Sequence, residues 1–312
     1  MNHFTRQFLC DRLKNEVQVA VFGKHPAWDD HIDDIGLSTN SLALTKHYLY
    51  VDGIAKQLAE GVWDRLLPEQ LAEFDHRFVW TYRQRAISGV ILASTDGKGR
   101  ARFPIVFCCQ AGVSGRIAVI SYLDLIEQLA LHCREFTAQA AVREAVLRMK
   151  LTLNSSCVRR AEPADFPSFP ESSDRDILLQ SLSLVADQIG RAHSPNNRGS
   201  HFRLPGISKN TKENLIFWCS YCARLAPDLT SLVISIANST YVDLIIGEPS
   251  STDFFCLRSN LSALPLTATL ASSTVDAKAL EYLEHYRTLP HGISGEGKRF
   301  WWRCLLKQFT PP

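Results

Sequence analysis

The sequence has no long apolar run and almost no excess of charge of either sign. No stretch of about 18 uncharged apolar residues occurs, and the best candidate, 117–131, contains Asp124 and Glu127. The first residues also lack the apolar segment of a signal peptide. With 34 basic and 32 acidic residues, the net charge is only +2, so a general electrostatic attraction to nucleic acid is missing. We therefore expect a cytoplasmic protein with no membrane span and no nucleic-acid partner.

The nine cysteines are odd in number, and several of them lie within apolar runs. Cys108, Cys109 and Cys256 are examples. This placement is typical of buried free thiols in a reducing compartment, which agrees with the cytoplasm.

Hydrophobic patterning predicts an α+β architecture, with helices packed on antiparallel sheets. The expected strands are 17–22, 78–82, 87–93, 103–109, 231–236, 241–246 and 254–258. The expected helices cover about 44–58, 122–133, 138–153, 177–189, 213–225 and 276–287, with Ser121 capping the second of them. The three β-type runs between 78 and 109 lie too close together for helical crossovers, so they should form an antiparallel meander.

A length of 312 residues suggests about two domains. Three prolines and three serines between 160 and 173 mark a linker. We therefore predict an N-terminal domain at 1–155, a linker at 156–174, and a C-terminal α/β domain at 175–312 with a short antiparallel sheet of its own.

Two loops concentrate the polar side chains. The first loop, 23–34, follows the first strand and contains Gly23, Lys24, His25, Pro26, Trp28 and Asp30. The second loop, 94–104, joins two apolar strands and contains Ser94, Asp96, Gly99, Arg100, Phe103 and Pro104. Glycine permits a tight connection, Asp96 can accept backbone amides in a turn, and Arg100 can grip a carboxylate or phosphate. We interpret both loops as structured turns or recognition loops, and we predict no metal or other cofactor.

An enzymatic alternative uses the acidic part of the first loop. Its carboxylates and imidazole could hold a divalent metal or supply a general acid and base for hydrolysis. The residues concerned are Asp29, Asp30, His31, Asp33 and Asp34. Their spacing matches no established metal signature.

Three other motifs favour structural interpretations. The segment 292–299 nearly matches a P-loop, but Arg299 stands where the magnesium-binding hydroxyl belongs. Cys219 and Cys222 form a CxxC inside a helical pattern, which favours buried core thiols. The basic, aromatic segment 298–307 is typical of a terminal helix that packs on its own domain, although such helices also dock on membranes or partners.

Taken together, the two loops resemble the TagF family of type VI secretion-associated proteins. Gly23, Lys24, Pro26 and Asp30 match its Gly-Lys-x-Pro-x-x-Gly-Asp-Phe segment, with Asp29 and His31 in place of the glycine and the phenylalanine. Its later pattern is matched by Gly89, Val90, Ser94, Asp96, Gly99, Arg100, Phe103 and Pro104. The resemblance covers about residues 15 to 135 and indicates a divergent member.

The resemblance implies a non-enzymatic cytoplasmic protein that represses type VI secretion post-translationally by binding other proteins. It implies a longin- or profilin-like N-terminal domain, an antiparallel sheet with flanking helices. It also implies a link to a forkhead-associated (FHA) scaffold and a threonine phosphorylation pathway. Because longin-like domains commonly bind small GTPases, an adaptor of a small GTPase system is a further alternative.

Overall fold

The computed structural model describes residues 16–155, 175–192, 199–270 and 277–288. Its strands form one antiparallel seven-stranded sheet, in the order β1-β4-β3-β2-β6-β7-β5. The strands are β1 (Gln18–Gly23), β2 (Asp75–Tyr82), β3 (Arg85–Leu92), β4 (Ile105–Ala111), β5 (Ser200–Pro205), β6 (Ser231–Ile236) and β7 (Tyr241–Ile246). The α+β class is thereby confirmed, and so is the meander, because β2 pairs with β3 and β3 with β4.

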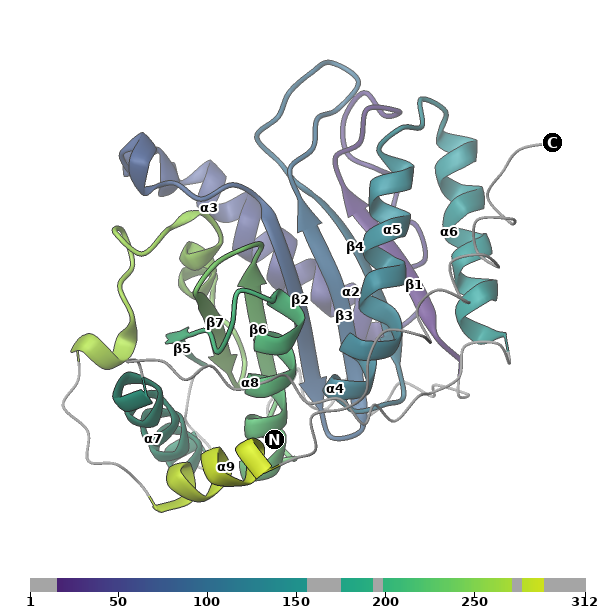
Figure 1. Ribbon diagram of the computed structural model, residues 1–312. Coiled ribbons are helices and arrows are strands. Elements are labelled where there is room, and N and C mark those ends of the chain that lie inside the picture. Colours follow the sequence, from purple (N-terminus) through teal and green to yellow (C-terminus); the bar gives the residue numbers. More distant parts are fainter. Residues whose placement is uncertain (1–15, 156–174, 193–198, 271–276, 289–312) are drawn as a thin grey trace.

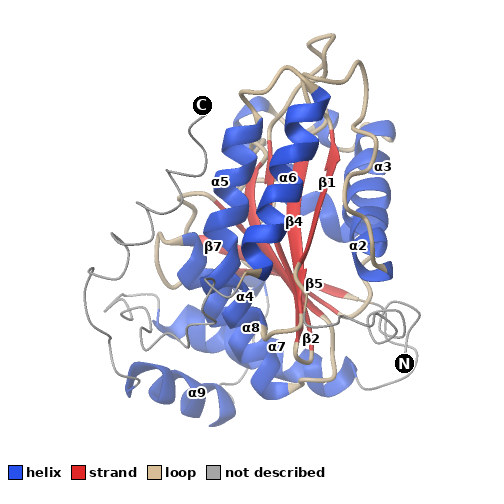
Figure 2. Ribbon diagram, turned by 90° about the vertical axis from the view of Figure 1, so that its right-hand side faces the viewer, coloured by secondary structure: helices blue, strands red, loops and turns tan. Residues whose placement is uncertain are grey.

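Helices cover both faces of the sheet (Figures 1 and 2). One face carries α2 (Asn40–Thr45), the π-helical segment η1 (Lys46–Ala55), α3 (Lys56–Ala59) and the 3-10 segment η5 (Ser251–Arg258). The other carries α4 (Gly115–Ala118), η4 (Val119–Leu123), α5 (Asp124–Cys133), α6 (Gln139–Asn154), α7 (Arg175–Ala192), α8 (Thr211–Leu225) and α9 (Ala277–Thr288). In Figure 2 the strands lie between α5 and α6 on one side and α2 and α3 on the other.

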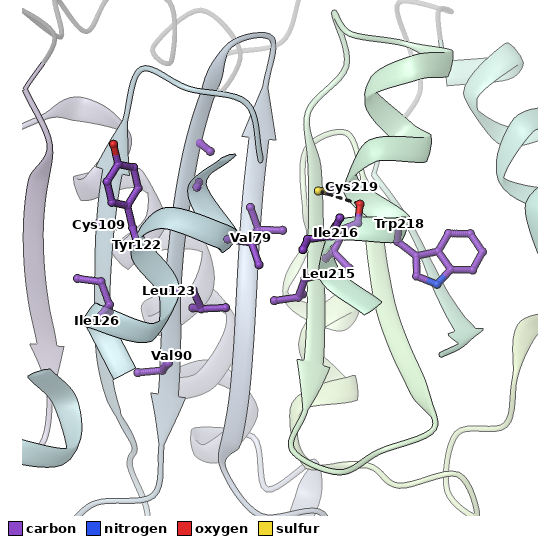
Figure 3. Packing of buried hydrophobic residues seen from close by; sticks show 14 of the residues in the cluster. Val79, Val90, Cys109, Tyr122, Leu123, Ile126, Leu215, Ile216, Trp218 and Cys219 are labelled. Carbon is purple, nitrogen blue, oxygen red and sulfur yellow. Dashed lines mark hydrogen bonds between the residues drawn. The ribbon is translucent and has the colours of Figure 1, made fainter. Parts of the chain in front are cut away.

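The side of the core under α4, η4, α5 and α8 is continuous across both halves of the chain. Figure 3 shows Val79 of β2 and Tyr122 of η4 in the same cluster as Trp218 of α8. These side chains are almost completely buried, and the Trp218 indole donates to the carbonyl of Pro205 at 3.0 Å. The apolar burial that stabilises each half is therefore shared with the other.

The expectation of a separate C-terminal sheet is wrong, because β6 pairs with β2. Val79 lies opposite Val233, and the hydroxyls of Thr81 and Ser231 are hydrogen-bonded at 2.8 Å. β2 is buried along most of its length, so its outer backbone groups need a partner, and β6 provides it. The predicted linker, 156–174, lies outside the described residues.

Three local predictions are also corrected. The segment 254–258 is not a strand but part of η5, where Ser250 and Asp253 cap the first turn reciprocally. The sequence does not predict β5, because the polar His201 and the charged Arg203 interrupt its apolar pattern. Ser121 does not cap a helix: Ser114 does so seven residues earlier, by accepting from the amide of Ile117.

The two outer strands of the sheet are partly covered along their free edges. Asn154 of α6 exchanges two hydrogen bonds with the backbone of Val17, and Ile35 exchanges two with Val21 of β1. On β5, the amide of Arg203 donates to the hydroxyl of Thr267 at 2.9 Å. These contacts satisfy backbone groups that an edge strand would otherwise present to solvent.

No helix within the described ranges is both long enough and apolar enough to cross a membrane.

Candidate functional site

The two motif loops lie against each other, and a buried ion pair joins them. The Lys24 ammonium donates to Asp96 Oδ2 at 2.6 Å, although the two residues are 72 positions apart. The side chain of Lys24 is 4% exposed and that of Asp96 is fully buried. We call these two residues and Arg100 the Lys24–Asp96–Arg100 cluster, because Arg100 Nε donates to the same carboxylate oxygen at 2.7 Å.

Asp96 is also held by its own turn. Its Oδ1 accepts the backbone amides of Lys98 and Arg100, both at 3.0 Å. Burial alone would raise the pKa of Asp96, but the donors from Lys24, Arg100 and Lys98 outweigh it and hold this pKa well below the usual range. The carboxylate therefore stays ionised at neutral pH and does not serve as a general acid or base there.

Backbone contacts fix how the loops approach each other. Gly23 has a φ of +113°, and a Cβ added there would lie 2.4 Å from the carbonyl oxygen of Pro104. That carbonyl accepts the amide of Lys24 at 3.1 Å, and Gly97 donates to the carbonyl of Trp28 at 2.7 Å. Glycine at position 23 is thus required by both conformation and space.

His25 and Trp28 hold the first loop against the C-terminal end of α5. The network assigns His25 Nε2 as the donor to the carbonyl of Cys133 at 2.8 Å and Nδ1 as the acceptor from the amide of Ala27 at 3.1 Å. Burial lowers the pKa of His25, with the Cys133 hydrogen bond opposing it, so the ring is neutral. The indole of Trp28 packs edge-on to this ring, with centroids 5.5 Å apart. Both ring nitrogens of His25 are therefore engaged in holding the loop.

The solvent-facing rim of the cluster consists of Asp30, His31 and Arg100. Asp30 Oδ1 lies 3.4 Å from both Lys24 Nζ and Arg100 Nη2, and 3.0 Å from His31 Nδ1. The side chains of Asp30 and Arg100 are 68% and 52% exposed. This rim is the solvent-exposed, charged part of the two loops.

The remaining motif residues shape the loops. The Phe103 ring lies 5.4 Å from the Lys24 ammonium, and Gly99 has a φ of +75° in the turn after Asp96. The carbonyl of Pro26 would lie 3.0 Å from a Cβ at Gly97. The Ser94 hydroxyl donates to the neighbouring carbonyl of Thr95 and takes no part in the ion cluster.

The acidic residues of the first loop are distributed among different cations. Asp33 pairs with Arg143 of α6 at 3.0 Å. Asp34 pairs with Lys46 of η1 at 2.6 Å. Within the described part of the chain, Asp29, Asp30, His31, Asp33 and Asp34 supply no group of three ligands close enough to share a metal ion. The arrangement suits turn formation and ion pairing.

Cys219 and Cys222 are buried in α8, as the sequence predicts. The Cys219 thiol donates to the carbonyl of Ile216 (dashed line in Figure 3), and burial raises its pKa to about 12. All six described cysteines are buried free thiols. The segments 292–299 and 298–307 lie outside the described residues.

The sequence patterns did not predict a second polar cluster, which consists of His201, Arg203, Asp243 and Cys256. Its members come from β5, β7 and η5, and they are up to 55 residues apart (from 201 to 256). A signal was nevertheless present, because Arg203 and Asp243 lie in two short strands that are mostly apolar apart from them. Charged side chains in such positions are seldom buried without a partner.

Comparison with known proteins gives few matches. No family model matches the sequence, and no curated protein matches it either. Among solved structures, the crystal structure of PA0076 from Pseudomonas aeruginosa PAO1 is similar at 17% identity, over 77% of this chain and 94% of that chain. The TM-score is 0.33, a level that does not establish a shared fold.

Proposed function

We propose that the protein is a non-enzymatic cytoplasmic regulator, similar to TagF, that controls type VI secretion post-translationally by binding a protein partner. The observation that carries this proposal is the Lys24–Asp96–Arg100 cluster. Its carboxylate is saturated by four donors from three residues, Lys24, Lys98 and Arg100. Such an arrangement suits a rigid recognition surface better than a catalytic centre, which needs a nucleophile or base with a free position.

The exposed rim is where we place partner recognition. Asp30 and Arg100 carry opposite charges 3.4 Å apart. Asp30 also contacts the buried Lys24, and Arg100 contacts the buried Asp96. A charged rim on a rigid support favours oriented encounter with a complementary protein surface. We therefore assign the buried members of the cluster to loop shape and the exposed members to the partner.

The longin- or profilin-like identity of the N-terminal half belongs to the same proposal. It is supported by four neighbouring strands, β1-β4-β3-β2, with α2 and η1 on one face and α5 and α6 on the other. The partner we propose is an FHA-domain scaffold of the secretion apparatus.

The test is secretion by the native host. Deletion of the gene should increase the release of type VI substrates into the medium, and the wild-type gene should restore repression. Arg100→Glu should fail to restore it, although the protein accumulates normally. Arg102→Glu is the matched control, because Arg102 pairs with Asp64 outside the cluster. Unchanged secretion after deletion would refute the proposal.

A binding experiment identifies the partner class. The purified full chain should retain the FHA scaffold in a pull-down, and Arg100→Glu should weaken this binding while Arg102→Glu should not. Retention of a small GTPase in place of the scaffold would contradict the proposed partner.

A further inference from the structure

His201, Asp243 and Cys256 lie together on the sheet face that η5 covers. The His201 ring nitrogen, an Asp243 carboxylate oxygen and Cys256 Sγ all lie within 4.8 Å of one another. Asp243 is 3% exposed and Cys256 is 1% exposed, while the His201 side chain is 16% exposed. The group is therefore buried, apart from the partly exposed side chain of His201.

Arg203 fixes the carboxylate of this group. Its Nε donates to Asp243 Oδ1 and its Nη2 to Oδ2, both at 2.9 Å. The guanidinium also donates to the carbonyls of Cys256 and Ser259, at 3.1 and 2.8 Å. His201 Nε2 lies 2.9 Å from Asp243 Oδ1. The carboxylate is thus oriented by a second group, as metal-binding carboxylates commonly are.

A second observation concerns a buried histidine on the same sheet face. His76 of β2 is 3% exposed, and its Nδ1 has no hydrogen-bond partner among the described residues. Phe78, Ile234 and Asp243 are aligned across β2, β6 and β7, and His76 is two residues from Phe78, so it shares their sheet face. Burial lowers the pKa of His76 to about 4, although the nearby carboxylate of Asp243 opposes this shift, so the ring is neutral at neutral pH. A buried imidazole nitrogen left unpaired in such a polar cluster calls for an explanation.

We propose that His201, Asp243 and Cys256 form a Zn²⁺ site, with the fourth position left to water. Imidazole, carboxylate and thiolate together are a ligand set that zinc prefers. At Zn–N and Zn–S distances of about 2.0 and 2.3 Å, tetrahedral ligand atoms lie about 3.3–3.5 Å apart. On binding, Cys256 Sγ would approach the other two ligand atoms by up to about 1 Å, while His201 Nε2 and Asp243 Oδ1 would move slightly apart from 2.9 Å. The ion would link β5, β7 and η5.

Zinc binding changes the protonation of two of the three ligands. In the metal-free protein a His201 ring with one proton, at Nε2, donates it to Asp243, and Cys256 is a thiol. On binding, the ring proton moves to Nδ1, Nε2 becomes a ligand, and Cys256 releases its proton to solvent. Asp243 keeps its hydrogen bonds from Arg203. One proton is released for each zinc ion bound.

Titration of the metal-stripped full chain with Zn²⁺ against a chromophoric chelator tests this site. We expect one ion per chain, and a Cys256→Ser variant weaker by about tenfold or more. Cys222→Ser is the matched control, because Cys222 is also buried but lies in α8 on the other sheet face. Equal zinc affinity in the Cys256→Ser variant and the wild type would overturn the proposal.

Cobalt substitution keeps the test independent of whether a variant folds. The wild-type chain loaded with Co²⁺ should show a thiolate-to-cobalt charge-transfer band in the near ultraviolet. A wild-type chain that binds no Co²⁺ and no Zn²⁺, or that binds them without this band, would refute the site.

Discussion

Asp96 links two loops that are far apart in the sequence, because one carboxylate accepts donors from both. Its role as a turn former could be predicted, since aspartate before glycine commonly accepts nearby amides, as it does from Lys98 and Arg100. Its pairing with Lys24 could not be, because no local pattern specifies a partner 72 residues away. The sequence thus singled out both loops but did not indicate that they contact each other.

The Asp96→Asn variant should have a free energy of unfolding that depends less on pH in the acid range. The folded-state pKa of Asp96 is lowered, so its stabilisation is fully present above the unfolded value of about 4 and is lost as the pH falls toward the folded pKa. Urea unfolding should show a constant deficit for the variant between about pH 5 and 8, and a shrinking one below about pH 4.

Asp64→Asn is the control for this experiment, because Asp64 is exposed and pairs with Arg102 on the surface. It should change stability little at any pH. A deficit for Asp96→Asn that stays constant down to the acid transition would contradict the assigned role.

Gly23→Ala should destabilise the protein by about 2 kcal/mol or more, since the new Cβ meets both a positive φ and the carbonyl of Pro104. Gly112→Ala is the matched control: it has open space and no positive φ, so its effect should stay within about 0.5 kcal/mol. Chemical denaturation of both variants measures the difference, and similar losses in the two would refute the steric argument.

At the scale of elements, sequence patterning succeeded where one apolar period dominates. β1, β6 and β7 alternate or run apolar, and they fold as strands. The pattern gave the wrong prediction where a contact with a residue distant in the sequence determines the local structure. β5 carries Arg203, which is buried only because Asp243 of β7 neutralises it. The aromatic run of η5 is apolar enough for a strand, but a capped 3-10 turn buries Phe254, Cys256 and Leu257 against the sheet instead.

The π-helical segment η1 places Gly53 directly against η5. A Cβ at Gly53 would lie 2.8 Å from two ring atoms of Phe254. Gly53→Ala should therefore cost about 1–3 kcal/mol through overpacking. Gly190→Ala in α7, where a Cβ meets nothing within 4 Å, should stabilise the protein by about 0.5–1 kcal/mol. Thermal unfolding should shift in opposite directions, and a stabilising Gly53→Ala would be inconsistent with this packing.

At the scale of the whole molecule, β2 pairs with β6, and this pairing, the β2–β6 junction, joins the two halves of the sheet. We expect the two halves to unfold together for this reason. A boundary near the proline- and serine-rich segment was a reasonable inference from composition, but composition carries no information on strand pairing across it. The junction places Val79 and Val233 opposite each other, both fully buried. The two halves of the sheet therefore share backbone hydrogen bonds as well as a core.

Val233→Ala should destabilise both halves together, by about 1–3 kcal/mol. In native-state hydrogen exchange, amides of β3 and β4 should exchange faster by the same factor as those of β7. Leu131→Ala on the exposed surface of α5 is the control and should leave these rates unchanged. Faster exchange confined to β6 and β7 would show that the halves open independently.

The same junction has a consequence during synthesis. Thr81 of β2 meets Ser231 of β6 across 150 residues of chain. At a translation rate of about 5–20 residues per second, roughly 8 to 30 seconds pass between the synthesis of β2 and that of β6. Throughout that time β2, which carries Phe78, Val79 and Trp80, has one unpaired edge. Such an edge is the kind of surface that chaperones bind and through which nascent chains aggregate. The yield of native protein should therefore depend on chaperone supply more strongly than the stability of the finished fold would suggest.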